Sequence, residues 1–220
     1  MKSNETLQKE VQDAIKWEPL LNAAEIGVTA KDGVITLSGN VDSYVKKVEA
    51  ETAAKNVAGV KAVAENIKVH FESSFSKNDT EIATEIVSAW KWNWNWNVPD
   101  SKLKVKVETG WVTLEGEVEW NYQKEAARKS VEKLTGVKGV TNNILIKSGY
   151  KDAVEEVAIE RAFRRSWSIN DNDVKVSVNH NNVKLSGSVT SLYQKDEAAR
   201  LAWNTPGVYS VDNELSVVYN

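Results

Sequence analysis

Hydrophobic residues occur along the chain at two spacings, one typical of helices and one typical of strands. Leu7, Val11 and Ile15 follow one another at intervals of four residues, which predicts a helix with one apolar face. The stretch 26–41 instead alternates apolar and polar residues on both sides of an Asp-Gly pair at 32–33. Alternation around such a pair predicts a β-hairpin, because this dipeptide suits the backbone of a tight turn.

A second helix and a third strand complete this unit. Residues 43–57 carry alanine on one face, which would let a helix lie close to a sheet, and residues 60–69 return to apolar positions typical of a strand. A helix that connects the second and third strands favours a parallel pair beside the antiparallel hairpin. The predicted fold class is therefore α+β, with two helices on one face of a small mixed three-stranded sheet.

The same order of elements occurs three times. Residues 31–69, 108–146 and 179–217 align without a gap, and each contains Leu-x-Gly followed 20 residues later by Gly-Val. A repeat of about 70 residues is longer than the roughly 20–50 residues of a solenoid unit and fits a small domain with its own core. We therefore expect three tandem domains, at 1–72, 78–147 and 150–220.

Six glycines hold fixed places in the repeat. The first glycine of each unit lies on the inward face of the second strand, where the missing side chain is expected to let a helix approach. The second glycine is expected at the end of the second helix. These structural glycines are Gly39, Gly116, Gly187, Gly59, Gly136 and Gly207.

Two short motifs connect the repeat with a known family. The order α-β-β-α-β, the strand pattern V-x-L-x-G-x-V and the helix-ending G-V-x-x-V-x-N resemble the BON domain, named for bacterial osmotically inducible and nodulation proteins. Residues 35–41 and 183–189 match the first motif. Residues 59–66 and 207–213 match the second, with Asn66 one or two places late. The resemblance implies non-enzymatic modules of the bacterial cell envelope that bind phospholipid surfaces or proteins, some of them in osmotic or envelope stress.

Composition narrows the possible partners and compartments. The chain has no cysteine, and its 28 basic and 31 acidic residues are spread evenly, so nucleic acid is not expected as a partner. No apolar stretch approaches the ~20 residues of a transmembrane segment, and the N-terminus lacks the apolar core of a signal peptide. The sequence as given predicts a cytoplasmic protein. The alternative, if a signal peptide has been removed, is a periplasmic or extracellular one.

The sequence contains no arrangement that predicts catalysis. His70 and His180 fall at different points of the repeat, and Glu115, Glu117 and Glu119 alternate along a strand, as on a solvated face. Phosphate-binding loops and nucleophile elbows are missing. We therefore predict no enzyme, no catalytic residues, no metal and no cofactor.

The middle unit holds six of the nine tryptophans. Trp90 and Trp92 align with Ile15 and Trp17 of the first unit, so these tryptophans are expected in the core or at its rim. The other four stand at positions where the sister units have no large apolar side chain. This candidate interaction surface consists of Trp94, Trp96, Trp111 and Trp120.

Two interpretations of these four tryptophans stay open at this point. They either pack against the neighbouring units or form an exposed aromatic surface, since tryptophan suits membrane interfaces and protein contacts. Arg161, Arg164 and Arg165, at the end of the third unit's first helix, are a candidate contact for lipid phosphate. Alternatively, these three arginines bind no ligand and only place positive charge at the end of the helix, where it suits the helix dipole.

Our leading hypothesis is a non-enzymatic binding module that attaches to a phospholipid or envelope surface, or to a partner protein, through the middle unit. The alternative is a structural protein that self-assembles into oligomers or filaments through its strand edges and its aromatic patch.

Overall fold

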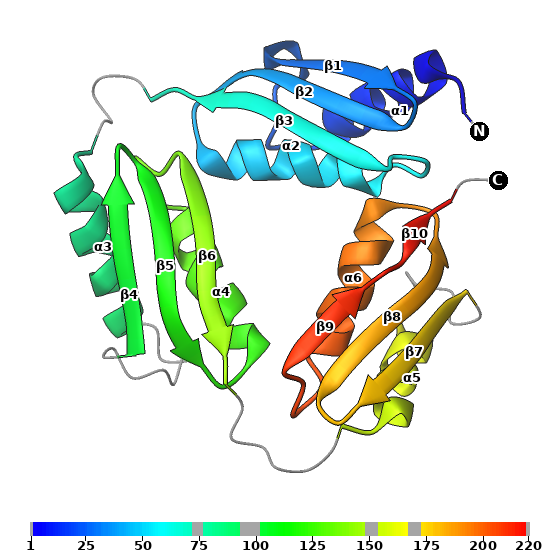
Figure 1. Ribbon diagram of the computed structural model, residues 1–220. Coiled ribbons are helices and arrows are strands. Elements are labelled where there is room, and N and C mark those ends of the chain that lie inside the picture. Colours follow the sequence, from blue (N-terminus) through cyan, green and yellow to red (C-terminus); the bar gives the residue numbers. More distant parts are fainter. Residues whose placement is uncertain (1, 72–76, 93–101, 148–153, 167–172, 219–220) are drawn as a thin grey trace. The chain divides into compact units, whose positions relative to one another are not determined.

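The computed structural model describes residues 2–71, 77–92, 102–147, 154–166 and 173–218 (Figure 1). Over these residues the chain forms three separate sheets, each with two helices on one face. The predicted α+β class with three tandem units is thereby confirmed. In the middle and third units the second and third strands are parallel, whereas the hairpin strands are antiparallel, so these sheets are mixed.

The first unit has the predicted order of elements, with one added turn of 3-10 helix (η1). Its elements are α1 Asn4–Trp17, η1 Ala23–Glu25, β1 Ile26–Lys31, β2 Val34–Val41, α2 Tyr44–Asn56 and β3 Ala62–Val69. The predicted apolar stripe of the first helix is buried, at Leu7, Val11 and Ile15.

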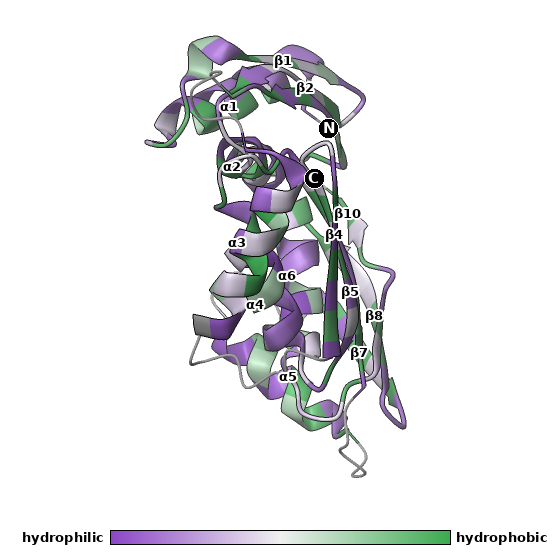
Figure 2. Ribbon diagram, turned by 90° about the vertical axis from the view of Figure 1, so that its left-hand side faces the viewer, coloured by the Kyte–Doolittle hydropathy of each residue, from purple (hydrophilic) through white to green (hydrophobic). Residues whose placement is uncertain are grey.

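The middle unit repeats this order. Its elements are α3 Asp79–Trp92, β4 Leu103–Glu108, β5 Trp111–Val118, α4 Asn121–Glu132 and β6 Gly139–Ile146. Its core includes Ile82 and Ile86 from the first helix and Val112 and Leu114 from the central strand, all fully buried. The elements in Figure 2 carry both hydrophobic and hydrophilic residues, as expected where one face is buried.

The third unit differs in its last strand, which is split in two. Its elements are α5 Glu156–Arg165, β7 Val174–Asn179, β8 Asn182–Val189, α6 Leu192–Trp203, β9 Ser210–Asn213 and β10 Ser216–Val217. Both β9 and β10 pair with β8 in parallel.

At the same aligned position of each unit, one side chain accepts a hydrogen bond from the backbone N–H two residues later. Asn142 Oδ1 accepts a hydrogen bond from Ile144 N at 3.3 Å, and Glu65 Oε1 accepts one from Ile67 N at 2.7 Å. Asn213 does the same in the third unit. In the first unit Glu65 thus holds the place of the motif asparagine, and Asn66 follows one residue later.

The start of the first helix is tied to the hairpin turn. Asp79 accepts hydrogen bonds from Thr109 N at 2.7 Å and Gly110 N at 2.8 Å, and Asn4 Oδ1 accepts one from Asp32 N at 2.9 Å. Because the helix begins at the turn, its last residue lies at the opposite end of the hairpin. We call that opposite end, where the first strand begins and the second strand ends, the connection end of a unit.

The strand glycines are required, but not for the reason predicted from the sequence. A Cβ on Gly116 would lie 2.1 Å from the carbonyl oxygen of Lys102, just before the neighbouring strand, and Gly116 has a φ of 127°. A Cβ on Gly39 would lie 2.0 Å from the carbonyl oxygen of Glu25, and one on Gly187 would lie 2.1 Å from that of Asp173. The neighbouring strand's backbone, and not a helix, therefore excludes a side chain there.

The second set of glycines also differs from expectation. α2 ends at Asn56, and Gly59 is the third residue of a separate four-residue turn, closed by Val60 N bonding to Val57 O at 3.2 Å. Its φ of 96° fits the third position of a type II turn. Gly136 and Gly207 hold the same place after α4 and α6, so these glycines follow the helix end and do not cap it.

Candidate interaction surfaces

The described part of the chain does not bring the predicted tryptophan surface together as one patch. Trp111 begins β5 and Trp120 follows its end, so the two lie at opposite ends of a strand that rises about 3.3 Å per residue. Trp94 and Trp96 lie outside the described residues.

Trp111 points outward, as predicted, and is 49% exposed. Its indole Nε1 donates to Thr141 Oγ1 at 2.9 Å. A Cβ on Gly139, which is opposite Trp111 on β6, would lie 2.4–2.7 Å from three carbons of the six-membered ring. The ring therefore lies on the backbone of Gly139.

Trp120 occupies the N-cap position of α4, where its sister Ser191 caps α6 by accepting a hydrogen bond from Gln194 N at 3.2 Å. An indole has no acceptor for this bond. Gln123 Oε1 instead accepts from the backbone N–H groups of Glu119 and Trp120, both at 3.0 Å. A half-buried tryptophan here departs from the usual preference for small polar residues at this position.

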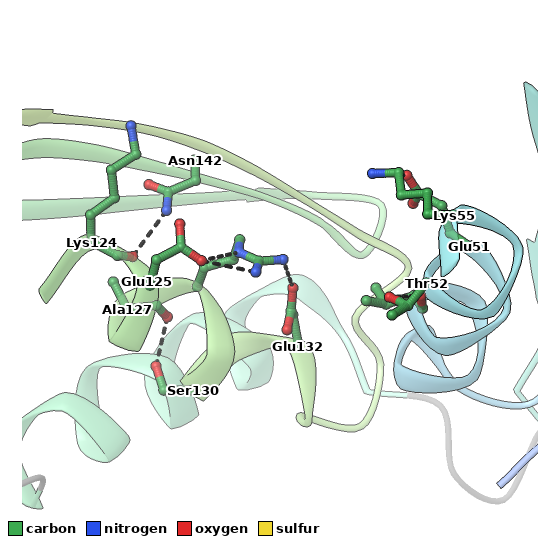
Figure 3. Close-up of polar contacts among 11 residues, drawn as sticks. Glu51, Thr52, Lys55, Lys124, Glu125, Ala127, Ser130, Glu132 and Asn142 are labelled. Carbon is green, nitrogen blue, oxygen red and sulfur yellow. Dashed lines mark hydrogen bonds and ion pairs between the residues drawn. The ribbon is translucent and has the colours of Figure 1, made fainter. Parts of the chain in front are cut away.

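The expectation for the tryptophans at the helix ends is correct for Trp90 and wrong for Trp17. Trp90 packs partly buried against the middle core, and its Nε1 donates to Ser130 Oγ at 3.1 Å. Ser130 in turn donates to the carbonyl of Ala127 (Figure 3). Trp17 is 84% exposed, whereas the side chain of Trp92 lies outside the described residues.

The turn after α1 presents apolar side chains to solvent. Pro19 prevents the helix from continuing, and the chain turns with Leu21 N bonding to Glu18 O at 3.0 Å. Leu20 in this turn is 47% exposed, beside the more exposed Trp17. We call residues 17–21 the Trp17 turn; it lies at the connection end of the first unit.

The aligned pair Trp17 and Trp92 already placed aromatic side chains at the end of the first helix of two units. In two units the last residue of the first helix is a tryptophan, Trp17 in α1 and Trp92 in α3. The connection end of the middle unit also carries Trp120 and Tyr122, a residue that is 52% exposed and was not predicted. The same end is therefore aromatic in more than one unit.

The three candidate arginines lie on the last turns of α5 and are exposed. Arg164 and Arg165 end the helix, so they too lie at the connection end of their unit, and Arg161 is one turn earlier. Cations at this position also suit the negative end of the helix dipole.

Two carboxylates lie near one another in the first unit. Burial raises the pKa of Glu49, and the charge of Glu18, in the Trp17 turn, raises it further. A lower pH therefore removes negative charge near the Trp17 turn.

The described residues contain no group of three or more His, Cys, Asp or Glu side chains placed to hold a metal ion. Within the same ranges, no helix has the length and apolarity needed to cross a bilayer.

Three stretches of the chain, 3–70, 78–148 and 151–219, match the family model of the BON domain. The chain belongs to the BON domain family. The resemblance inferred from the strand and turn motifs is therefore confirmed, and it covers nearly the whole length of this BON protein.

Two curated relatives belong to bacterial species. Osmotically-inducible protein Y of Escherichia coli is 31% identical over 131 residues, which are 58% of this chain and 64% of that protein. Outer membrane lipoprotein DolP of Haemophilus influenzae is 30% identical over 140 residues, 62% of this chain and 71% of that protein. The match thus spans less than two thirds of the first relative.

Among solved structures, CdsD, a structural protein of the type III secretion system of Chlamydia trachomatis, aligns over 97% of this chain and 92% of that one. The TM-score is 0.25 and the identity 15%, too low to support an argument about this chain.

Proposed function

We propose that this BON protein is a non-enzymatic protein of the bacterial cell envelope that attaches to phospholipid surfaces through the connection ends of its units. The observation that carries the proposal is the Trp17 turn, in which an ordered backbone turn holds an 84% exposed tryptophan beside an exposed leucine. Tryptophan and leucine at such a tip suit the boundary between lipid headgroups and acyl chains.

The size of the exposed apolar surface supports weak attachment by one unit. Burying a tryptophan removes roughly 150–250 Å² from water, which at about 25 cal/mol per Å² gives roughly 4–6 kcal/mol before any cost of binding is subtracted. A single turn would therefore bind lipid only weakly. Several units on one chain would bind much more tightly together, because each raises the effective concentration of the next.

The arginines of the third unit fit the same interaction. Arg164 and Arg165 lie at the connection end, and guanidinium groups bind phosphate through paired hydrogen bonds. In this proposal they contact the headgroups of anionic lipids while the aromatic side chains enter the interface.

The names of the two relatives support a location in the cell envelope more than one in the cytoplasm. One is named an osmotically inducible protein and the other an outer membrane lipoprotein. We therefore adopt the periplasmic alternative for this chain, with a role in osmotic or envelope stress.

Vesicle flotation tests the proposal. The full chain is mixed with vesicles of phosphatidylglycerol and phosphatidylethanolamine, and the double variant Trp17→Ala/Leu20→Ala is compared with Val34→Ala. Val34 is a matched control, because it is 40% exposed in the same unit but lies beside the hairpin turn. We expect about tenfold weaker binding for the double variant and no change for the control.

Two further variants separate the contributions of lipid charge and of the middle unit. Arg164→Gln/Arg165→Gln should weaken binding to phosphatidylglycerol vesicles and leave binding to phosphatidylcholine vesicles unchanged. Trp94→Ala/Trp96→Ala tests the tryptophans outside the described residues. Wild-type protein that stays unbound, or a Trp17→Ala/Leu20→Ala variant that binds as well as wild type, would overturn the proposal. If light scattering instead shows a mass that grows with concentration and falls in that variant, the exposed turn serves self-assembly.

A further inference from the structure

The outward face of the middle sheet carries one aromatic ring whose orientation is fixed by two contacts. The Nε1–Thr141 hydrogen bond of 2.9 Å holds the rim of the Trp111 indole, and the backbone of Gly139 supports one face of its six-membered ring. With 49% of the residue exposed, the opposite face of the ring is directed to solvent. The ring is therefore a flat, rigid platform.

Both partners of this platform are specific to the middle unit. The positions aligned with Trp111 are Val34 and Asn182, and those aligned with Gly139 are Ala62 and Ser210. In the third unit the two aligned residues hydrogen-bond to each other, from Ser210 Oγ to Asn182 Oδ1 at 2.6 Å. The fold thus accepts valine or asparagine in place of the tryptophan and alanine or serine in place of the glycine, so it does not require a tryptophan on a glycine.

Hydrogen-bonding side chains surround the platform. The strand register places Glu108 opposite Trp111, and Lys106 opposite Thr113, all on the outward face. Lys106 Nζ and Glu108 Oε1 form an exposed ion pair at 3.0 Å, and Thr113 is opposite Thr141 on β6. An ammonium, a carboxylate and hydroxyl groups therefore lie on the strands around one aromatic face.

This combination selects among ligands. An acyl chain or an apolar peptide would need continuous apolar surface, whereas here the neighbours of the ring are charged or hydroxylic. A pyranose ring has one face of C–H groups, which carry partial positive charge and suit the negative face of an indole. Its equatorial hydroxyl groups would reach the polar side chains at the rim.

We propose that the outward face of the β4–β5–β6 sheet binds a neutral glycan chain, one of whose pyranose rings stacks on Trp111. This site lies on the sheet face near the hairpin turn, and it is therefore separate from the connection end used in the proposed attachment to phospholipid. The two can be tested independently, because a loss at one surface leaves the other intact.

The test uses the full chain and three soluble probes, which are maltohexaose, cellohexaose and the hexamer of N-acetylglucosamine. Each is titrated while the indole N–H resonance of Trp111 is followed by NMR, assigned with Trp111→Phe. We expect a saturable shift for at least one hexaose, with a dissociation constant near the millimolar affinities, about −4 kcal/mol, of single small contacts. Vesicles with and without a glycolipid carrying the same sugar then distinguish a membrane-linked glycan from a free polysaccharide.

Two variants locate the site. Trp111→Ala removes the ring. Gly139→Ala keeps the ring but displaces it, because the new methyl group would lie 2.4 Å from the nearest ring carbon of Trp111. Both should weaken glycan binding by at least tenfold and leave vesicle binding unchanged, while Trp17→Ala should do the reverse.

An aromatic ring over a strand glycine also protects the sheet, which would give Trp111 a purely structural role. In that case Trp111→Ala lowers the stability of the middle unit, but none of the three hexaoses shifts the Trp111 resonance of the wild-type chain. That result would overturn the proposal, as would hexaose binding that survives in the folded Gly139→Ala variant.

Discussion

Replacing Asn142 by Asp tests whether one amide group fastens the third strand of a BON unit to its second helix. Asn142 Nδ2 donates to the carbonyl of Lys124 in α4 at 3.0 Å (Figure 3), and its Oδ1 accepts from Ile144 N. Asn213 makes the same pair of bonds in the third unit, with Lys195 O at 2.8 Å. Aspartate keeps the acceptor but has no N–H for the helix carbonyl.

The expected loss of stability follows from the aspartate carboxylate, which would face the carbonyl oxygen of Lys124 without a hydrogen between them. A neutral hydrogen bond contributes about 1 kcal/mol, and a partly buried carboxylate against a carbonyl oxygen adds a penalty, for a total of about 1.5–3 kcal/mol. Since ~1.4 kcal/mol is a factor of ten, amides of β6 and α4 should exchange hydrogen roughly 10- to 100-fold faster. Hydrogen exchange with mass spectrometry on the full chain measures this unit by unit, with the unchanged third unit as internal control.

The first unit supplies the reverse experiment, because it has Glu65 at the aligned position. Its carboxylate accepts from Ile67 N at 2.7 Å but has no N–H to donate to Lys47, the counterpart of Lys124. Glu65→Asn adds this donor and should slow exchange of the first unit's amides severalfold. Unchanged exchange after Asn142→Asp, or faster exchange after Glu65→Asn, would refute the reasoning.

Three other changes have definite expected outcomes. Gly116→Ala should destabilise the middle unit by more than about 3 kcal/mol, measured by urea unfolding, because its Cβ would meet Lys102 O at 2.1 Å and its φ is positive. Asp79→Ala removes two hydrogen bonds to the hairpin turn and should cost about 1–3 kcal/mol in the same assay. Burial and the charge of Glu18 raise the pKa of Glu49, so the folded first unit loses stability as the pH rises and Glu49 becomes charged. Glu49→Gln should therefore raise the urea midpoint at pH ~7 and leave it unchanged below roughly pH 4.

Much of the fold could be predicted from the sequence because it depends on local spacing. The four-residue intervals of Leu7, Val11 and Ile15 specify a buried helix face in any α-helix, and strand alternation specifies which side of a hairpin is buried. The three aligned copies then indicated the family, because the residues that the fold requires in every copy stand at the same positions and form its strand and turn motifs. For the same reason the outward direction of Trp111 could be inferred from its phase along β5.

The remaining features depend on which groups meet across the fold, and only the tertiary structure decided them. The alignment with Trp92 placed Trp17 in the core or at its rim, whereas the structure shows this last residue of α1 to be 84% exposed. The carbonyl that excludes a side chain at Gly116 comes from the residue before β4, and the support of Trp111 comes from Gly139 on β6. Spacing along the chain specifies the face on which a side chain lies, whereas its exposure and its contacts depend on residues brought to it from elsewhere in the sequence.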